Sequence, residues 1–204
     1  MSEAKKSGYS NGNEIIVCGP LKYLLTDVNS TDSKLRNYKH SFGIALSGPS
    51  FLQTNDELVS YGKIIQNRFN LDMYVRPHPA LSQDYIDSLL SETKYSISKG
   101  SMVEFANECN FVILGNTNTF ADLIALGVPT FRMISSDGLD FFEEISDLKF
   151  TNEKELLNQV TLVGDDELNI IIEKWSDFVC PKWDIRERYI STFNKIMNKG
   201  DNSK

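Results

Sequence analysis

The sequence predicts an α/β protein built on a doubly wound, Rossmann-like parallel sheet, with helices at its C-terminal end. From residue 42 onward, short apolar segments alternate with helix-length amphipathic segments, which is the pattern of successive βαβ units. Two of the apolar segments, 71–75 and 111–114, run directly into polar loops. Because ligands of parallel α/β sheets bind beyond the carboxyl ends of the strands, these two loops predict a binding site.

The first half of the expected domain contains three strands with two helices between them. Residues 42–47 form a strand that ends at Gly48-Pro49, and Asn55 caps a helix that runs to about residue 69. Residues 71–75 form the second strand, and Ser82 caps a helix that ends near residue 91. Residues 95–98 form a short third strand. Right-handed crossovers then place these strands side by side in one sheet.

The second half repeats the alternation with shorter elements. Residues 101–109 form a helix, 111–114 a strand, 117–126 a helix that Gly127 ends, and 128–133 a strand. A helical turn is expected at 139–145 and a weak edge strand at 148–150. Helices are expected at 152–160 and once or twice within 165–198.

These elements predict one main domain with extensions. Residues 1–13 are expected to be a disordered tail, 14–41 a short strand (14–18) and an irregular linker, and 42–164 the Rossmann-like domain. Residues 165–199 are expected to be helices that pack on the domain, and 200–204 to be disordered. An aromatic face in that region packs on the sheet or, alternatively, on a partner; it comprises Trp175, Phe178, Trp183, Tyr189 and Phe193.

Composition excludes several classes of function. The 204 residues carry a net charge of −7 with a pI of about 4.9, which argues against general nucleic-acid binding. Cys18, Cys109 and Cys180 show no metal-binding spacing, so free thiols in a reducing, cytoplasmic compartment are expected. No apolar run approaches the roughly 20 residues that a transmembrane helix needs. A role at the inner face of the membrane would therefore be peripheral or depend on a partner.

The loop Arg76-Pro-His-Pro79 is the first candidate for chemistry. Prolines on both sides of His78 stiffen the turn, so the imidazole points in a fixed direction at the carboxyl edge of the sheet. Arg76 offers a guanidinium fork and His78 a group that donates or accepts a proton, and both suit a phosphate or diphosphate. The alternative is a rigid surface turn in which His78 packs locally.

The loop Gly115-Asn116-Thr117-Asn118-Thr119 is the second candidate. Gly115 permits close backbone approach, and the Asn/Thr run supplies a helix cap together with amide donors at a helix start, which suit an anion. Plain capping is the alternative, although capping needs only one of the four polar residues. Neither loop matches the Walker A or GxGxxG pattern.

Other strand ends supply further candidates. The turn Ser47-Gly48-Pro49-Ser50 follows the expected central strand and could meet a phosphate or an acceptor group. The segment beginning at Ser98 could contact a nucleobase, Asp122 could reach a ribose hydroxyl, and the segment from Asp137 to Asp140 could frame the far side of the pocket. An ordinary turn or helix surface is the alternative for each. No catalytic carboxylate pair and no metal-binding motif is recognisable.

Taken together, residues 42–160 resemble the C-terminal, donor-binding half of GT-B glycosyltransferases. The resemblance is to bacterial capsule and surface-polysaccharide enzymes: polysialyltransferases, capsule-export-linked transferases and CDP-glycerol glycerophosphotransferases. In these families a His-Pro motif follows one strand, and a Ser/Thr-rich loop opens a helix that is followed by Gly, an apolar residue and Pro. Here Arg76–Pro79, Gly115–Thr119 and Gly127-Val-Pro129 stand in that order.

The resemblance implies a site and a reaction. His78 would contact the donor phosphate and assist departure of the nucleotide, while residues 116–119 would hold the phosphates and Arg76 would add positive charge. Gly115, Ser47, Gly48, Ser98 and Asp122 complete the expected donor site. The implied reaction transfers a sugar or polyol phosphate from a nucleotide-activated donor, such as a nucleotide sugar or a CDP-polyol, to a glycan or lipid-linked acceptor, with no metal and no other cofactor.

The sequence also departs from these families. Their loop usually carries Ser/Thr followed by a Glu on the helix, where this chain has Asn-Thr-Asn-Thr and Asp122. A GT-B enzyme has a second Rossmann domain for the acceptor, and residues 1–41 are too short to form it. The chain is therefore expected to be a fragment, one subunit of a split transferase with a partner subunit, or a non-catalytic domain that binds a nucleotide or acts as a scaffold. An unrelated α/β domain with purely structural loops is the remaining alternative.

Overall fold

The computed structural model describes residues 40–115, 117–134, 140, 142–179 and 189–194. The chain divides into two compact units. One comprises Val28–Val179, and the other combines Met1–Asp27 with Cys180–Lys204. The expected strand at 14–18, the linker up to residue 39, and Trp183 lie outside the described residues. Within the second unit, the described residues 189–194 are helical.

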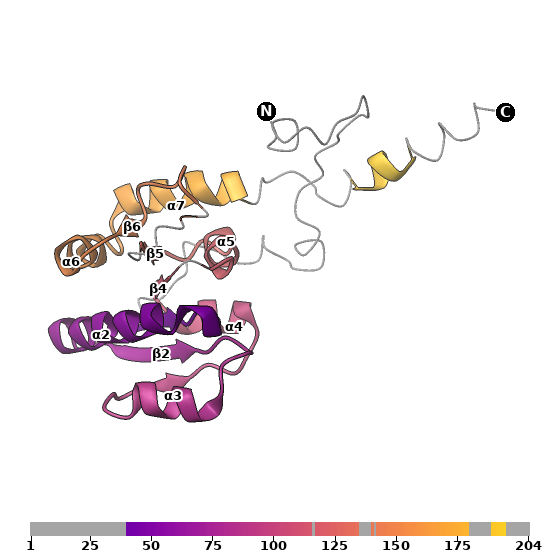
Figure 1. Cartoon of the computed structure of the whole chain (residues 1–204). Coiled ribbons are helices and arrows are strands. Elements are labelled where there is room, and N and C mark those ends of the chain that lie inside the picture. The colour runs from indigo at the N-terminus through magenta and orange to yellow at the C-terminus, as the bar shows by residue number, and fades with distance from the viewer. Residues whose placement is uncertain (1–39, 116, 135–139, 141, 180–188, 195–204) are drawn as a thin grey trace. The chain divides into compact units, whose positions relative to one another are not determined.

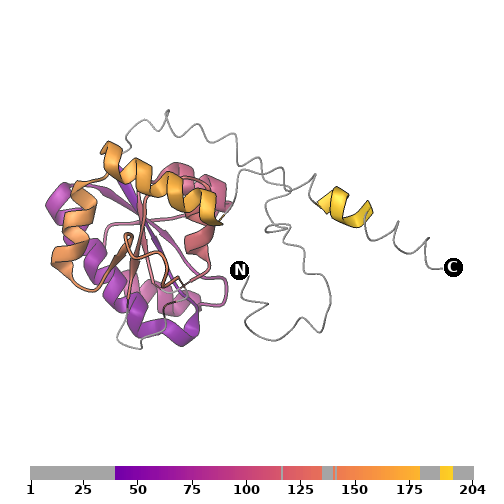
Figure 2. The ribbon, with the colours of Figure 1, turned by 90° about the horizontal axis from the view of Figure 1, so that it is seen from above.

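The unit Val28–Val179 is a six-stranded parallel sheet with the strand order β3-β2-β1-β4-β5-β6, so the predicted fold class is confirmed. Helices lie on both faces of this sheet (Figures 1 and 2). The strands are β1 (Ser41–Ala45), β2 (Asp72–Arg76), β3 (Ser96–Ile97), β4 (Val112–Leu114), β5 (Thr130–Met133) and β6 (Lys149–Phe150). The helices are η4 (Pro49–Phe51), α2 (Leu52–Phe69), α3 (Gln83–Leu90), α4 (Met102–Glu108), α5 (Thr119–Ala125), α6 (Glu153–Thr161) and α7 (Asp166–Val179).

The strand order places the topological switch point between β1 and β4. The chain builds outward from β1 through β2 to β3, then returns across the sheet to β4 and builds outward in the other direction. Gly43 of β1 therefore pairs with Tyr74 of β2 on one side and with Val112 of β4 on the other. In such sheets the crevice for a ligand opens where the two directions diverge.

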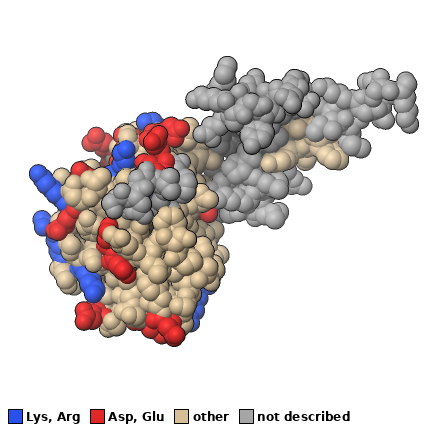
Figure 3. Space-filling model, viewed as in Figure 1, with Lys and Arg blue, Asp and Glu red and all other residues tan. Residues whose placement is uncertain are grey.

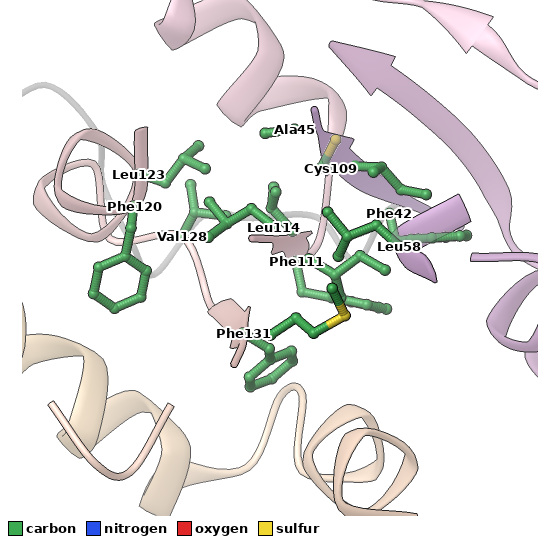
Figure 4. Packing of buried hydrophobic residues seen from close by; sticks show 14 of the residues in the cluster. Phe42, Ala45, Leu58, Cys109, Phe111, Leu114, Phe120, Leu123, Val128 and Phe131 are labelled. Carbon is green, nitrogen blue, oxygen red and sulfur yellow. The ribbon is translucent and has the colours of Figure 1, made fainter. Parts of the chain in front are cut away.

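The core is a continuous apolar layer around the central strands. Every residue of β1, β4 and β5 is buried, as expected for parallel strands covered on both faces. Phe42 stacks on Phe111 with ring centroids 5.5 Å apart, and Phe111 lies 5.9 Å from Phe131. Figure 4 shows these rings next to Leu58 of α2 and Leu114 of β4. This packing fixes the positions of the strand ends that carry the candidate site.

Two expected helices differ from the observed ones. The helix expected to begin at Asn55 begins at Leu52, because the Asn55 side chain bonds the Ser47 backbone and does not cap the helix. The expected helical turn at 139–145 is not helical in its described part, where residues 142–144 form a turn. Ser82 caps α3 as predicted, and Ser101, expected as the first residue of the next helix, is the cap of α4; each accepts a backbone N–H bond with its side chain.

The aromatic face expected near the C-terminus divides into a buried and an exposed part. Trp175 is buried and donates its indole N–H to Asp147, whereas Phe178 is 60 % exposed. The two rings meet edge to face at 5.5 Å. Among the described helices, none is long and apolar enough to cross a membrane.

Gly43 is expected to tolerate no side chain. A Cβ built on it would lie 2.7 Å from Cζ of Phe105 and 2.8 Å from Sγ of Cys109, both buried. We expect Gly43→Ala to lower the free energy of unfolding by about 1–3 kcal/mol, since overpacking of a core costs about that much. Denaturant titration measures this change, and Phe105→Leu in the same chain should restore part of it. A neutral effect of Gly43→Ala would contradict the packing described here.

Candidate functional site

The loop after β1 is held by the side chain of Asn55, which bonds the backbone N–H and carbonyl of Ser47 as a neighbouring strand would. Asn55, which is fully buried in α2, accepts the backbone N–H of Ser47 at 2.8 Å and donates its amide to the Ser47 carbonyl at 3.1 Å. Both backbone groups of Ser47 are thereby satisfied at the point where β1 ends. The turn that follows, Gly48–Phe51, closes with a 3.0 Å bond from the Phe51 N–H to the Gly48 carbonyl. The carboxyl end of β1 therefore has a fixed backbone.

The ring of His78, which follows β2, lies against the loop after β1. A Cβ built on Gly48 would lie 3.6 Å from Cε1 of His78 and 3.7 Å from each ring nitrogen. The imidazole therefore rests against the position where a side chain of residue 48 would begin. Because β1 and β2 are neighbours, two predicted site residues meet next to the switch point.

A backbone bond fixes the orientation of His78. Nδ1 accepts the N–H of Ala80 at 3.1 Å, and the His78 carbonyl accepts the N–H of Leu81 at 3.0 Å. With Nδ1 used as an acceptor, the neutral imidazole carries its proton on Nε2. His78 is exposed, so this arrangement offers an Nε2–H donor at the carboxyl edge of the sheet. Such a donor suits a phosphate oxygen.

The loop after β4 approaches the loop after β1 closely. A Cβ built on Gly115 would lie 2.6 Å from Cγ2 of Thr54 and 3.2 Å from Oγ of Ser47, so only a glycine fits between them. Gly48 and Gly115 thus lie in the loops that follow the two strands flanking the switch point. Asn116 lies outside the described residues.

The cap of α5 is supplied by Thr117. Its Oγ1 accepts the Thr119 N–H at 3.3 Å and lies 3.3 Å from the Thr119 hydroxyl. Asn118, at the N-cap position, makes no capping bond with its side chain and is exposed. Capping therefore uses the Thr117 hydroxyl and does not use the side chain of Asn118, which is exposed.

Arg76, the last residue of β2, bonds the backbone of the loop after β3. Its Nη1 donates to the Gly100 carbonyl at 2.6 Å and to the Ser101 carbonyl at 3.5 Å, and its guanidinium lies 5.9 Å from the ring of Phe105. Arg76 thereby joins β2 to the loop after β3. Contact between Arg76 and a phosphate remains a prediction, and it would have to share the guanidinium with these carbonyls.

A capping box fixes the end of the loop after β3, where α4 begins. Ser101 accepts the Glu104 N–H, and Glu104 accepts the Ser101 N–H at 2.5 Å. The bond from the Ser101 backbone is the main cause that lowers the pKa of Glu104. Ser98 begins this loop with a buried hydroxyl that has no hydrogen-bond partner within the part of the chain that the structure describes, and the same is true of the Ser47 hydroxyl. The sequence predicts both serines as donor-site residues because they follow strands, and their contact with a ligand stays a prediction.

The remaining predicted residues lie further along the sheet. Asp122 is in the first turn of α5 and half-buried. Asp140 pairs with the guanidinium of Arg132 and accepts the N–H of Phe142 at 2.9 Å, and Asp137 lies outside the described residues. Among the described residues, no group of three or more His, Cys, Asp or Glu side chains could hold a metal ion.

Two residues contribute to the site in ways that the sequence does not indicate. Asn55 has the position of a helix cap in the sequence, but its amide positions the loop after β1. Tyr85 of α3 stands in no recognisable motif, yet its hydroxyl lies 3.1 Å from the Leu52 carbonyl and 3.2 Å from an Asp56 carboxylate oxygen, which joins α3 to the start of α2. Burial, the Asp56 charge and this bond raise the pKa of Tyr85 to about 12.

Comparison of sequences finds no matching family model and no matching curated protein. Comparison of structures finds nucleotide-sugar epimerase and GT-B glycosyltransferase folds. A putative UDP-N-acetylglucosamine 2-epimerase from Listeria monocytogenes matches with a TM-score of 0.64 and 15 % identity over 97 % of this chain and 58 % of that protein. The Methanocaldococcus jannaschii UDP-GlcNAc 2-epimerase, in complex with UDP-GlcNAc and UDP, matches with a TM-score of 0.55 and 15 % identity over 81 % of this chain and 53 % of that protein.

A third solved structure, TarM, matches with a TM-score of 0.52 and 10 % identity over 77 % of this chain and 35 % of that protein. This chain therefore spans about half the length, or less, of these three proteins. At these identities the comparisons establish the fold, which is a Rossmann-like half of the GT-B type.

We expect Asn55→Leu to destabilise the protein by about 2–4 kcal/mol, because it leaves the buried N–H and carbonyl of Ser47 without partners and each such group costs about 1–3 kcal/mol. Denaturant titration measures the loss. Asn67→Leu, an exposed change near the other end of α2, is the matched control and should stay within about 0.5 kcal/mol of the parent. Equal effects of the two substitutions would show that the Asn55 bonds do not hold the loop.

Proposed function

We propose that this chain is the half of a GT-B-type enzyme that binds the nucleotide-activated donor, with the donor diphosphate against Gly48 and His78. One observation carries the proposal: the His78 ring lies on Gly48 beside the switch point, with Nδ1 bonded to Ala80 and an Nε2–H donor exposed. Structural packing alone gives no reason to leave this donor at the edge of the sheet where ligands of such folds bind.

The surroundings favour a ligand held by neutral donors. The guanidinium of Arg76 is bonded to two carbonyls, and the described residues of the loops after β1 and β4 include no Lys or Arg. In Figure 1, β2 points to the right, and Figure 3 shows an area without charged side chains right of the centre of the described surface, with charged side chains along its lower rim. A diphosphate would therefore be held by N–H and O–H groups, as fixed dipoles hold developing charge in other enzymes.

The reaction that we propose is transfer of the donor's sugar or polyol phosphate. In the sugar case, the bond between the anomeric carbon and the diphosphate oxygen breaks while the acceptor oxygen forms the new bond. The nucleoside diphosphate leaves with the electron pair, and His78 Nε2–H stabilises its oxygen by hydrogen bonding. The acceptor proton passes to a base on the acceptor side. No metal is needed for this step, since the donors named above act on the leaving phosphate.

We further propose that the reaction belongs to bacterial surface-polysaccharide synthesis in the cytoplasm. The acceptor would be a glycan or a lipid-linked molecule, and a partner subunit or a further domain would supply the acceptor site. The order of the motifs Arg76–Pro79, Gly115–Thr119 and Gly127–Pro129 supports it.

The second candidate is the donor-binding half of a nucleotide-sugar epimerase. It is favoured by the TM-scores of 0.64 and 0.55 to two UDP-GlcNAc 2-epimerases, which exceed the 0.52 to TarM. Both candidates require the same diphosphate contact, so binding is tested first and the reaction afterwards.

Titration calorimetry with UDP, UDP-GlcNAc, CDP and CMP tests the proposal. We expect one base family to bind saturably, and His78→Ala to raise its Kd by about 10–100-fold, since a hydrogen bond to a charged group contributes about 1.5–3 kcal/mol. His78→Gln keeps an N–H donor near the position of Nε2 and should bind between the two.

His40→Ala is the matched control, because His40 is the other histidine of the chain and its side chain is exposed away from the strand ends that carry the site. It should leave Kd and Tm unchanged. Absence of binding by the parent chain to all four nucleotides would contradict the proposal and favour a scaffolding domain. Binding that His78→Ala does not weaken would place the nucleotide elsewhere.

A further inference from the structure

Arg132 is a buried cation on the strand next to one edge of the sheet, and the proposed function does not yet use it. It lies on β5 with no exposed surface, between the apolar residues Phe131 and Met133. Burial lowers the pKa of its guanidinium, and the neighbouring Asp140 carboxylate partly offsets that effect. Among the described residues, Nε of Arg132 has no hydrogen-bond partner. Because burying a charged guanidinium costs free energy, we expect Arg132 to have a role beyond filling the core.

The Arg132 guanidinium bonds several described residues of the segment that follows β5. It pairs with the Asp140 carboxylate and donates to the Phe142 carbonyl at 3.0 Å and to the Ile145 carbonyl at 3.3 Å. Asp140 in turn accepts the Phe142 N–H at 2.9 Å. These directional bonds determine where the described part of residues 140–145 lies. An apolar residue at position 132 could pack but could not supply them, and replacing a buried ion pair by apolar residues is often neutral for stability.

The same guanidinium lies between two aromatic rings. Its central carbon is 5.2 Å from the ring of Phe120 and 5.5 Å from the ring of Phe142, and the two rings are 4.9 Å apart. Phe120 is fully buried and directly follows Thr119 in the first turn of α5. Figure 4 shows Phe120 to one side of the cluster that contains Phe42 and Leu58. The contacts therefore join the start of α5 to Asp140 and residues 142–145.

We propose that Arg132 is a positioning residue of the nucleotide site: by holding Phe120, it fixes the start of α5 and with it the backbone of Thr117–Thr119 in the loop after β4, which meets the loop after β1 at Gly115. The Phe120 N–H bond to the Thr117 carbonyl, 3.1 Å long, and the Ala121 N–H bond to the Asn118 carbonyl, also 3.1 Å, transmit this constraint to the loop. Arg132 itself touches no ligand. The inference rests on the proposed function only where it concerns nucleotide affinity.

The double variant Arg132→Met/Asp140→Asn tests the inference with the fold preserved. Met fills the space without leaving an unpaired charge, and Asn keeps an oxygen that accepts the Phe142 N–H. Ile65→Val, a buried change on α2 remote from α5, is the control for general destabilisation. Amide hydrogen exchange of the ligand-free protein and the Kd for UDP are measured well below the Tm of each variant.

We expect the double variant to speed exchange of the Phe120 and Ala121 amides at least tenfold and to raise the Kd for UDP at least fivefold, while Ile65→Val changes neither. Unchanged exchange at these amides would overturn the inference. Faster exchange with an unchanged Kd would restrict Arg132 to a structural role and overturn its link to the site. If the parent chain does not bind UDP, the proposed function fails for that nucleotide, while the exchange result still decides whether Arg132 positions α5.

Discussion

The two hydrogen bonds between the Asn55 side chain and the Ser47 backbone are the constraint on which the site depends. Ser47 is the point where β1 leaves the sheet, beside the place where the strand order reverses. A buried amide that satisfies both backbone groups gives this turn one conformation, and it also ties the turn to the first part of α2. The adjacent Thr54 then meets Gly115, so the loop after β4 is packed against the same helix start.

The loop after β2 completes the arrangement. Gly48 has no side chain, so the His78 ring can rest on it, and the Ala80 N–H fixes which ring nitrogen faces outward. Tyr85 holds α3 against the start of α2, which keeps the two loops together. Arg76 does the same for the loop after β3. Four loop positions are thus fixed by side chains that need not touch a ligand, and this leaves His78 as an oriented donor.

Much of the fold could be predicted from the sequence because it depends on local signals. The alternation of apolar and amphipathic segments predicted the parallel sheet, and Ser82 and Ser101 marked the starts of two helices because a serine hydroxyl there bonds within three residues. The His-Pro turn predicted a rigid imidazole, and the structure shows which nitrogen is bonded. Gly115 was predicted to permit close approach of a ligand, which stays a prediction; the structure shows that side chains of Thr54 and Ser47 leave no room for a Cβ there.

Other features depend on partners that no local pattern reveals. Asn55 resembles a helix cap in sequence, because the same side chain that caps a helix can also bond a strand end eight residues earlier. Arg76 was assigned to a phosphate, since the sequence does not show that two carbonyls of the loop after β3 face its guanidinium. Arg132 lies within an apolar strand, and the acceptors that make its burial tolerable come from residues 140–145.

The proposed position of the nucleotide diphosphate, beside the switch point and against Gly48 and His78, can be examined by NMR. The isotopically labelled chain is titrated with UDP while its amide and imidazole signals are followed. We expect the shifts to concentrate at residues 47–51 and 78–81 and at Nε2 of His78. Shifts that instead concentrate at the opposite ends of the strands or on α6, with His78 unperturbed, would contradict the proposed position.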